Sequence, residues 1–129
     1  MKLLLDTHVF IWYINDDSRL PQKWREVIAD RGNYVYLSVV SIWEAVIKAT
    51  LGKLQLRSQS NSYLSKQRQL HLIAELPLNE ACVNHLASLP LLHRDPFDRI
   101  LICQALEHDL TIMTIDAEIK KYAVTCLEL

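Results

Sequence analysis

Glycine and cysteine are scarce in this sequence, and the few that are present form no recognisable motif. The only glycines are Gly32 and Gly52, and neither lies in a glycine-rich loop, which excludes a P-loop or a dinucleotide-binding fingerprint. The cysteines, Cys82, Cys103 and Cys126, are odd in number and widely spaced, without a CxxC pair. We expect them to be reduced, mostly buried thiols of a cytosolic protein rather than disulfide partners or zinc ligands.

Long hydrophobic runs and a strong excess of one charge are also absent. No apolar stretch approaches the length needed to cross a membrane. The first residues reach the acidic Asp6 too early for the apolar core of a signal peptide. We therefore expect a cytoplasmic protein that makes no contact with a membrane. The net charge of −1 gives no overall positive field for nucleic acid, although a local basic rim or a bound metal would still receive a phosphodiester.

The sequence does have the composition of a folded α/β protein. Half of its 129 residues are hydrophobic and 22% are charged, which fits one globular domain spanning residues 1–129. Short apolar runs predict strands at 3–5, 34–37, 72–76, 110–114 and 124–127. Helices are predicted at 7–15, 21–30, 39–51, 63–70, 79–89, 95–108 and 116–122. This alternation of strands and helices predicts an α/β fold with a mainly parallel sheet.

Four carboxylates stand at the edges of apolar elements or inside them. Asp6 ends the first predicted strand, Asp116 follows the fourth, Glu44 interrupts an apolar helix, and Asp98 precedes another. Acidic side chains are rarely buried unless they are paired or bound to metal. Ligands of parallel sheets bind beyond the carboxyl ends of the strands, so we expect Asp6 and Asp116 to share one site. A cluster of carboxylate oxygens suits Mg²⁺ or Mn²⁺.

Each of these acids also has a purely structural interpretation. Asp6 and Asp116 are both suited to cap the helix that follows, and a capping carboxylate still has a second oxygen for a metal. Glu44 is spaced to pair with Lys48 four residues later, an interaction worth only about 0.2–0.5 kcal/mol. Because Ser41, Glu44 and Lys48 form one polar stripe on an otherwise apolar helix, we expect that stripe to face a cleft.

Asp95 and Asp98 are assigned different roles. Asp95 followed by Pro96 has the signature of a helix N-cap and first helical residue, which puts Asp98 in the first turn. Both acids complement the helix dipole there. We interpret Asp95 as the cap and Asp98 as the ligand.

In this order and spacing, four fragments resemble the PIN domain, a small metal-dependent nuclease fold that includes the VapC-type toxins of bacterial toxin–antitoxin modules. The resemblance covers essentially the whole chain. The fragments are Leu4-Leu5-Asp6-Thr7-His8, Ser41-Ile42-Trp43-Glu44, Asp95-Pro96-Phe97-Asp98-Arg99-Ile100-Leu101 and Thr114-Ile115-Asp116.

The resemblance implies a three-layer α/β/α fold and a function. Asp6, Glu44, Asp98 and Asp116 would be the catalytic, metal-binding acids, with the fourth often acting through water. Thr7, Thr114 and Arg99 are accessory candidates, and the sequence does not decide whether Arg99 pairs with a carboxylate or meets a phosphate. The implied activity is that of a Mg²⁺- or Mn²⁺-dependent endoribonuclease acting on RNA. The implied partners are a second copy of the chain and an inhibitory antitoxin.

Two other functions compete with this one. A non-catalytic PIN-like module would bind RNA or a protein, and the presence of all four acids argues against it. A Mg²⁺-dependent phosphatase of the doubly wound type would need a second aspartate two residues after the first, and Asp6-Thr7-His8 lacks it. The five histidines show no metal-ligand spacing, and no nucleophile elbow supports Ser/His/Asp catalysis.

Overall fold

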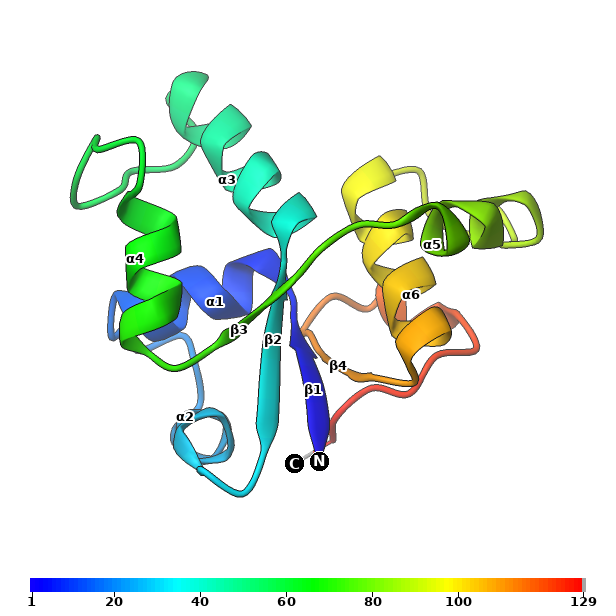
Figure 1. Ribbon diagram of the computed structural model, residues 1–129, viewed down its shortest axis with the longest axis horizontal. Coiled ribbons are helices and arrows are strands. Elements are labelled where there is room, and N and C mark those ends of the chain that lie inside the picture. Colours follow the sequence, from blue (N-terminus) through cyan, green and yellow to red (C-terminus); the bar gives the residue numbers. More distant parts are fainter. Residues whose placement is uncertain (129) are drawn as a thin grey trace.

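A sheet of four parallel strands forms the centre of the protein, for which a computed structural model describes residues 1–128 (Figure 1). The strands are β1 (Lys2–Leu5), β2 (Tyr34–Ser38), β3 (Ala74–Leu76) and β4 (Thr111–Met113). Their order across the sheet is β3-β2-β1-β4, and every neighbouring pair is parallel. In the register, Leu4 of β1 lies opposite Tyr36 on one side and Ile112 on the other.

Alternate strand residues face two separate apolar clusters, as the two-residue period of a strand requires. Leu3 and Leu5 of β1 join one cluster, and Leu4 between them joins the other. The first cluster includes buried residues of helices α1 (Thr7–Ile14), α2 (Gln22–Ala29), α3 (Val39–Thr50) and α4 (Tyr63–Leu70). The second includes those of α6 (Pro96–His108). Helices therefore cover both faces of the sheet, which confirms the predicted three-layer α/β/α fold.

Several helices begin where a polar side chain caps their first turn. Asp6 accepts from Thr7 N, Ser38 from Val40 N, and Asn79 from Cys82 N at the start of the short helix α5 (Glu80–Asn84). Asp95 accepts from Phe97 N and Asp98 N, with Pro96 as the first residue of α6. These caps satisfy backbone N–H groups that have no partner inside the helix, and they confirm the predicted cap roles of Asp6 and Asp95.

Three predicted elements differ in kind from the prediction, in whole or in part. The helix expected at 79–89 ends at Asn84 and continues as the 3₁₀ turn η1 (His85–Ala87). The helix expected at 116–122 is reduced to the 3₁₀ turn η2 (Ile119–Lys121), because the Asp116 carboxylate accepts from Glu118 N and so competes with helical hydrogen bonding. The strand expected at 124–127 contributes only an isolated parallel bridge between Cys126 and Ile112.

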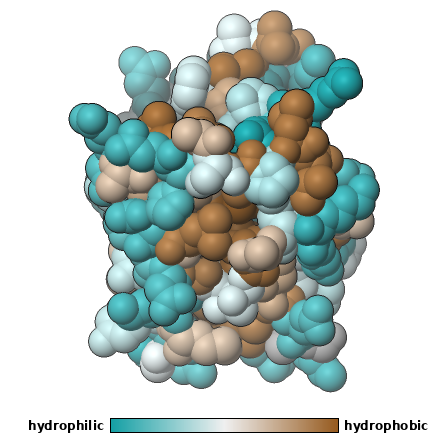
Figure 2. Space-filling model, turned by 90° about the vertical axis from the view of Figure 1, so that its right-hand side faces the viewer, coloured by the Kyte–Doolittle hydropathy of each residue, from teal (hydrophilic) through white to brown (hydrophobic). Residues whose placement is uncertain are grey.

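The surface keeps a number of large apolar side chains. Figure 2 shows hydrophobic area on the face formed by the right-hand side of Figure 1. Exposed apolar residues of the segment joining β3 to α6 are Leu78, Val83, Leu91 and Leu92. On α3, Val39, Trp43 and Val46 are exposed as well, with Trp43 exposed at 59%. All three cysteines are free thiols, and two of them are buried, as predicted. Within residues 1–128, no helix combines the length and apolarity needed to span a bilayer.

Candidate active site

The site lies where the order of the strands reverses along the chain. The chain runs outward from β1 through β2 to β3, then returns to place β4 on the other side of β1. The loop after β1 and the loop after β4 therefore run in opposite directions. This leaves a crevice at the carboxyl ends of the two strands. Asp6 follows β1 directly, and Asp116 lies three residues beyond the end of β4. The topology brings these two acids to one place, as the sequence predicted.

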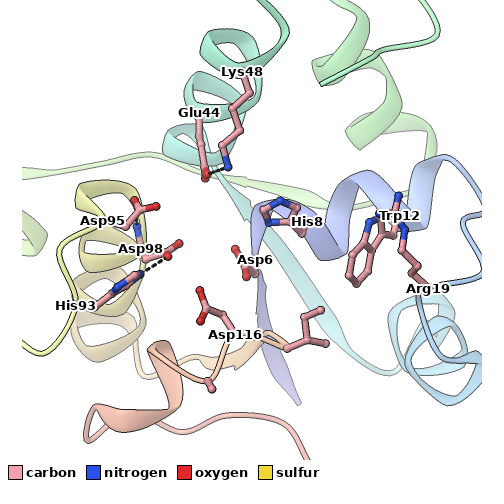
Figure 3. Close-up of a pocket in the computed structure, with 12 residues that line it drawn as sticks. Asp6, His8, Trp12, Arg19, Glu44, Lys48, His93, Asp95, Asp98 and Asp116 are labelled. Atoms are coloured by element: carbon pink, nitrogen blue, oxygen red, sulfur yellow. Dashed lines mark hydrogen bonds and ion pairs between the residues drawn. The ribbon is translucent and has the colours of Figure 1, made fainter. Parts of the chain in front are cut away.

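A pocket of about 550 Å³ occupies this crevice. Figure 3 shows acidic side chains entering it from β1, α3, α6 and the segment after β4. Five carboxylates line the pocket, those of Asp6, Glu44, Asp95, Asp98 and Asp116. Arg19 and Lys48 are the permanently charged cations that line it, joined by His8 and His93. All four acids singled out in the sequence thus reach one pocket that has an excess of negative charge.

Asp6 is held by a hydrogen bond to each of its oxygens. Its side chain is 4% exposed. Oδ1 accepts from Thr7 N at 2.7 Å as the cap of α1, and Oδ2 accepts from the Thr114 hydroxyl at 2.8 Å. The Thr114 oxygen in turn accepts from Asp116 N at 2.9 Å. Thr114 therefore ties the acid that ends β1 to the backbone of the acid that follows β4.

Glu44 is held in the same way, from two other directions. It is 3% exposed on α3. The Thr7 hydroxyl donates to Oε1 at 2.7 Å, and Lys48 Nζ donates to Oε2 at 2.6 Å. The predicted pairing with Lys48 is therefore present, but it lines the pocket rather than open solvent. Ser41 of the expected polar stripe is instead buried, and its hydroxyl has no partner within residues 1–128.

Asp98 projects from the first turn of α6, where Asp95 caps the helix. Asp98 is 7% exposed, and its Oδ2 lies 2.8 Å from Nε2 of His93. Asp116 is half-buried across the pocket, and its Oδ1 accepts from Glu118 N at 2.9 Å. Each of these two acids keeps one oxygen without a hydrogen-bond donor from residues 1–128.

Burial, and to a smaller extent nearby negative charge, disfavours the charged forms of Asp6 and Asp98. Burial raises the pKa of Asp6. The pKa of Asp98 is raised to about 7, first by burial and then by the negative charges of Asp6, Asp95 and Glu44, against the opposing hydrogen bond from His93. Both shifts have the direction that burial of a carboxyl group produces.

The pKa values of two basic side chains of the pocket are raised as well, which favours their charged forms. Burial acts to lower the pKa of Lys48, but its hydrogen bond to Glu44 and the nearby acids outweigh burial and raise that pKa. Burial likewise acts to lower the pKa of His93, and Asp98, Asp116 and Asp95 together raise it. The pocket thus favours the charged forms of Lys48 and His93.

His93 is the site residue that sequence reasoning missed. One ligand atom each from His93, Asp98 and Asp116 lies within 4.8 Å of the other two. His93 and Asp98 are five residues apart, and Asp116 lies beyond the rest of α6 and β4. Such a group has no regular spacing, and the sequence carries no signal that would have distinguished His93 from the other histidines.

Within residues 1–128, Arg99 neither pairs with a carboxylate nor lines the pocket. Its Nη1 donates to Pro90 O at 2.9 Å and to the Tyr122 hydroxyl at 3.1 Å, and its Nη2 donates to Leu89 O at 3.4 Å. Arg99 therefore fastens the segment before α6 to the C-terminal part of the chain. Of the two alternatives that the sequence leaves open, the structure shows no pairing with a carboxylate within residues 1–128, and contact with a phosphate stays a prediction.

The residues of the pocket fit a divalent cation. Three buried acids from separate elements, Asp6, Glu44 and Asp98, converge with Asp116 on one space. Their oxygens are hard donors of the kind that Mg²⁺ and Mn²⁺ prefer. A bound cation would also relieve the repulsion that raises the pKa values of Asp6 and Asp98.

Comparison with known proteins decides the family. The family model of the PIN domain matches residues 3–124. The chain belongs to the PIN domain family. No curated protein sequence matches it.

Solved structures share the fold of this PIN domain at low sequence identity. VapBC2 from Rickettsia felis, bound to a DNA fragment from its promoter, has a chain that is 16% identical, with a TM-score of 0.72 over 99% of this chain and 98% of its own. VapBC-1 from nontypeable Haemophilus influenzae is 20% identical, with a TM-score of 0.64 over 94% and 91%. FitAcB from Neisseria gonorrhoeae is 20% identical, with a TM-score of 0.63 over 98% and 96%.

Proposed function

We propose that this PIN domain is a Mg²⁺- or Mn²⁺-dependent endoribonuclease and the toxin of a type II toxin–antitoxin module. The observation that carries the proposal is the convergence of Asp6, Glu44, Asp98 and Asp116 in one pocket of a PIN-family chain. In this proposal the four acids are the catalytic residues. Whole-length likeness to chains of the VapBC and FitAcB structures supports the toxin role.

The four acids would hold one or two divalent cations between them. When bound, such a cation would supply Lewis acidity, making water a better nucleophile near neutral pH and stabilising negative charge on the scissile phosphate. Thr7 and Thr114 fix Glu44 and Asp6 by their hydroxyls. Because these acids are held before any ligand arrives, they need little reorganisation during the reaction.

The remaining polar groups of the pocket are suited to the substrate. Lys48 and Arg19 place positive charge on the pocket lining, where they would bind phosphate oxygens of an RNA strand. The carboxylates of the pocket would also accept the proton released by the attacking water. No covalent intermediate with the protein is required.

A protein partner would cover exposed apolar surface close to the site. Val39, Trp43 and Val46 are exposed on α3, the helix that carries Glu44. An inhibitory antitoxin would lay an apolar segment along this helix and block the acidic pocket beside it.

We also propose that the chain forms a homodimer. Light scattering on the protein freed of antitoxin would measure its molecular mass.

The decisive experiment is RNA cleavage by protein purified away from any antitoxin. Total RNA is incubated with Mg²⁺ or Mn²⁺ and, in parallel, with EDTA. We expect metal-dependent cleavage that is abolished in the double variant Asp6→Asn/Asp98→Asn. Cleavage that persists in EDTA or in the double variant would overturn the mechanism. RNA or protein binding without cleavage of any transcript would instead indicate a non-catalytic PIN module.

A further inference from the structure

His93 stands at the edge of the acidic pocket in a position that the four-acid scheme does not explain. It is neither one of the four acids nor a residue of the core. Its ring nitrogen Nε2 lies 2.8 Å from Oδ2 of Asp98, and the Asp116 carboxylate completes a group whose ligand atoms are mutually within 4.8 Å. Figure 3 shows the imidazole directed at Asp98, with Asp116 facing the same space.

Hydrogen bonds to Tyr122 hold the segment that carries His93 in place. Tyr122 is buried, and its hydroxyl oxygen accepts from the backbone N–H groups of Leu92 at 3.0 Å and His93 at 2.9 Å. The same oxygen accepts from Arg99 Nη1, whose guanidinium also binds Pro90 O. Two hydrogen bonds thus join the residues before α6 directly to Tyr122, and Arg99 of α6 bonds to both Tyr122 and Pro90. They fix the backbone of His93 beside the first turn of α6.

The 2.8 Å between His93 Nε2 and Asp98 Oδ2 is a hydrogen-bond distance, and it is also close to the spacing of two neighbouring metal ligands. Ligands on adjacent corners of an octahedral ion with bonds of about 2.1 Å lie about 3 Å apart. An ion pair between His93 and Asp98 would by itself balance the charge of Asp98, and it would need no further carboxylate beside it. Asp116 supplies one, from a different segment of the chain.

We propose that His93, Asp98 and Asp116 together form a mixed nitrogen–oxygen metal site that selects Mn²⁺ over Mg²⁺. This inference rests on the proposed function. It places one of the proposed divalent cations at the edge of the pocket where His93 lies. Mg²⁺ takes oxygen ligands and sheds its water reluctantly, whereas imidazole is a ligand for first-row transition metals. Replacing one oxygen donor by His93 therefore favours the transition metal.

The direct test is pulsed EPR of Mn²⁺ bound to the full-length protein, which detects a coordinated imidazole through its ¹⁴N coupling. We expect the ¹⁴N signal in wild type and its loss in His93→Gln. His8→Gln is the matched control, because His8 lines the same pocket on the opposite side, and it should keep the signal. Mn²⁺ bound to wild type without ¹⁴N coupling, or coupling that persists in His93→Gln, overturns the inference.

Binding affinities give a second, independent readout. Titration of free Mn²⁺, with Mg²⁺ as competitor, measures both affinities in each protein. Loss of an outer-shell partner alone commonly costs about 10–100-fold in metal affinity, so loss of a direct ligand should lower Mn²⁺ affinity by at least about tenfold. Mg²⁺ affinity should fall less, so that the ratio of the two affinities drops in His93→Gln. An unchanged ratio contradicts the proposed selectivity.

The two proposals fail in different ways. If Asp98→Asn binds Mn²⁺ as tightly as wild type, or wild type binds none, the acidic site itself is wrong and the inference falls with it. If Mn²⁺ binding depends on Asp98 but carries no ¹⁴N coupling, the endoribonuclease proposal stands and the role of His93 is refuted. Because the wild-type spectrum decides this point alone, a poorly folded His93 variant would not obscure it.

Discussion

The Thr7 hydroxyl donates to Oε1 of Glu44 at 2.7 Å, linking the first residue of α1 to the middle of α3. Thr7 directly follows Asp6, and its backbone N–H is the donor that Asp6 accepts. Thr7 therefore orients two acids of the pocket: its backbone N–H binds Asp6, and its hydroxyl binds Glu44. Both acids are buried, so their hydrogen-bond donors matter for stability as well as for geometry.

Removing this hydroxyl should destabilise the protein and loosen the site. In Thr7→Val the shape is retained, but a buried carboxylate oxygen loses its donor, which costs about 1–3 kcal/mol. The free energy of unfolding is measured by urea denaturation in EDTA, and metal affinity by titration. Thr7→Ser keeps the hydroxyl and is the control. Equal stability of the valine and serine variants would show that the hydrogen bond contributes little.

The two acids at the start of α6 should respond differently to the same substitution. Asp95 caps the helix, and asparagine caps about as well as aspartate, so Asp95→Asn should retain its fold and much of its cleavage. Asp98→Asn should fold but lose most activity, because it removes a proposed metal ligand. Cleavage rates and melting curves of both variants are compared. Activity lost in Asp95→Asn and kept in Asp98→Asn would reverse the assigned roles.

Neutralising Asp6 should stabilise the metal-free protein. Its pKa is raised by burial, which means that its charged form is costly in the fold. Asp6→Asn should therefore melt higher than wild type in EDTA, since asparagine still caps α1. Metal should help it less, whereas wild type should gain about 2.7 kcal/mol at a hundredfold excess of metal over Kd. A metal-induced shift as large as that of wild type would exclude Asp6 as a ligand.

The metal-free protein should lose stability as pH rises through neutrality. The pKa of Asp98 is raised from 3.8 to about 7 in the fold, so the folded state binds its proton more tightly than the unfolded state. The stability from this group is complete below about pH 4 and is lost as pH rises through about 7. The raised pKa of His93 acts in the same direction.

Asp98→Asn removes this titration, so its stability relative to wild type should increase with pH. The free energies of unfolding of the two proteins in EDTA, measured at intervals from about pH 4 to about pH 8, give the difference directly. A difference that stays constant, or that shrinks as pH rises, would contradict the raised pKa of Asp98.

Local patterns in the sequence were enough to predict most elements of the fold. The apolar runs at β1 and β2, and the Asp95-Pro96 pair that begins α6, act over a few residues and survive in the structure. The segment at 124–127 did not become a strand of the sheet. There Val124 N donates to Tyr122 O, a local turn that leaves only Cys126 aligned with β4.

The sequence by itself determined that four acids sit at the edges of apolar elements or inside them, because the apolar pattern around each acid is a local feature. It also determined that Asp95 caps a helix. Only the tertiary structure decided which polar groups meet. Thr114 reaches Asp6 across 108 positions, and His93 meets Asp116 only because the strand order reverses beside β1. Arg99 donates instead to backbone carbonyls of the loop before α6 and does not line the pocket. Such contacts depend on the path of the whole chain, which no spacing along the sequence records.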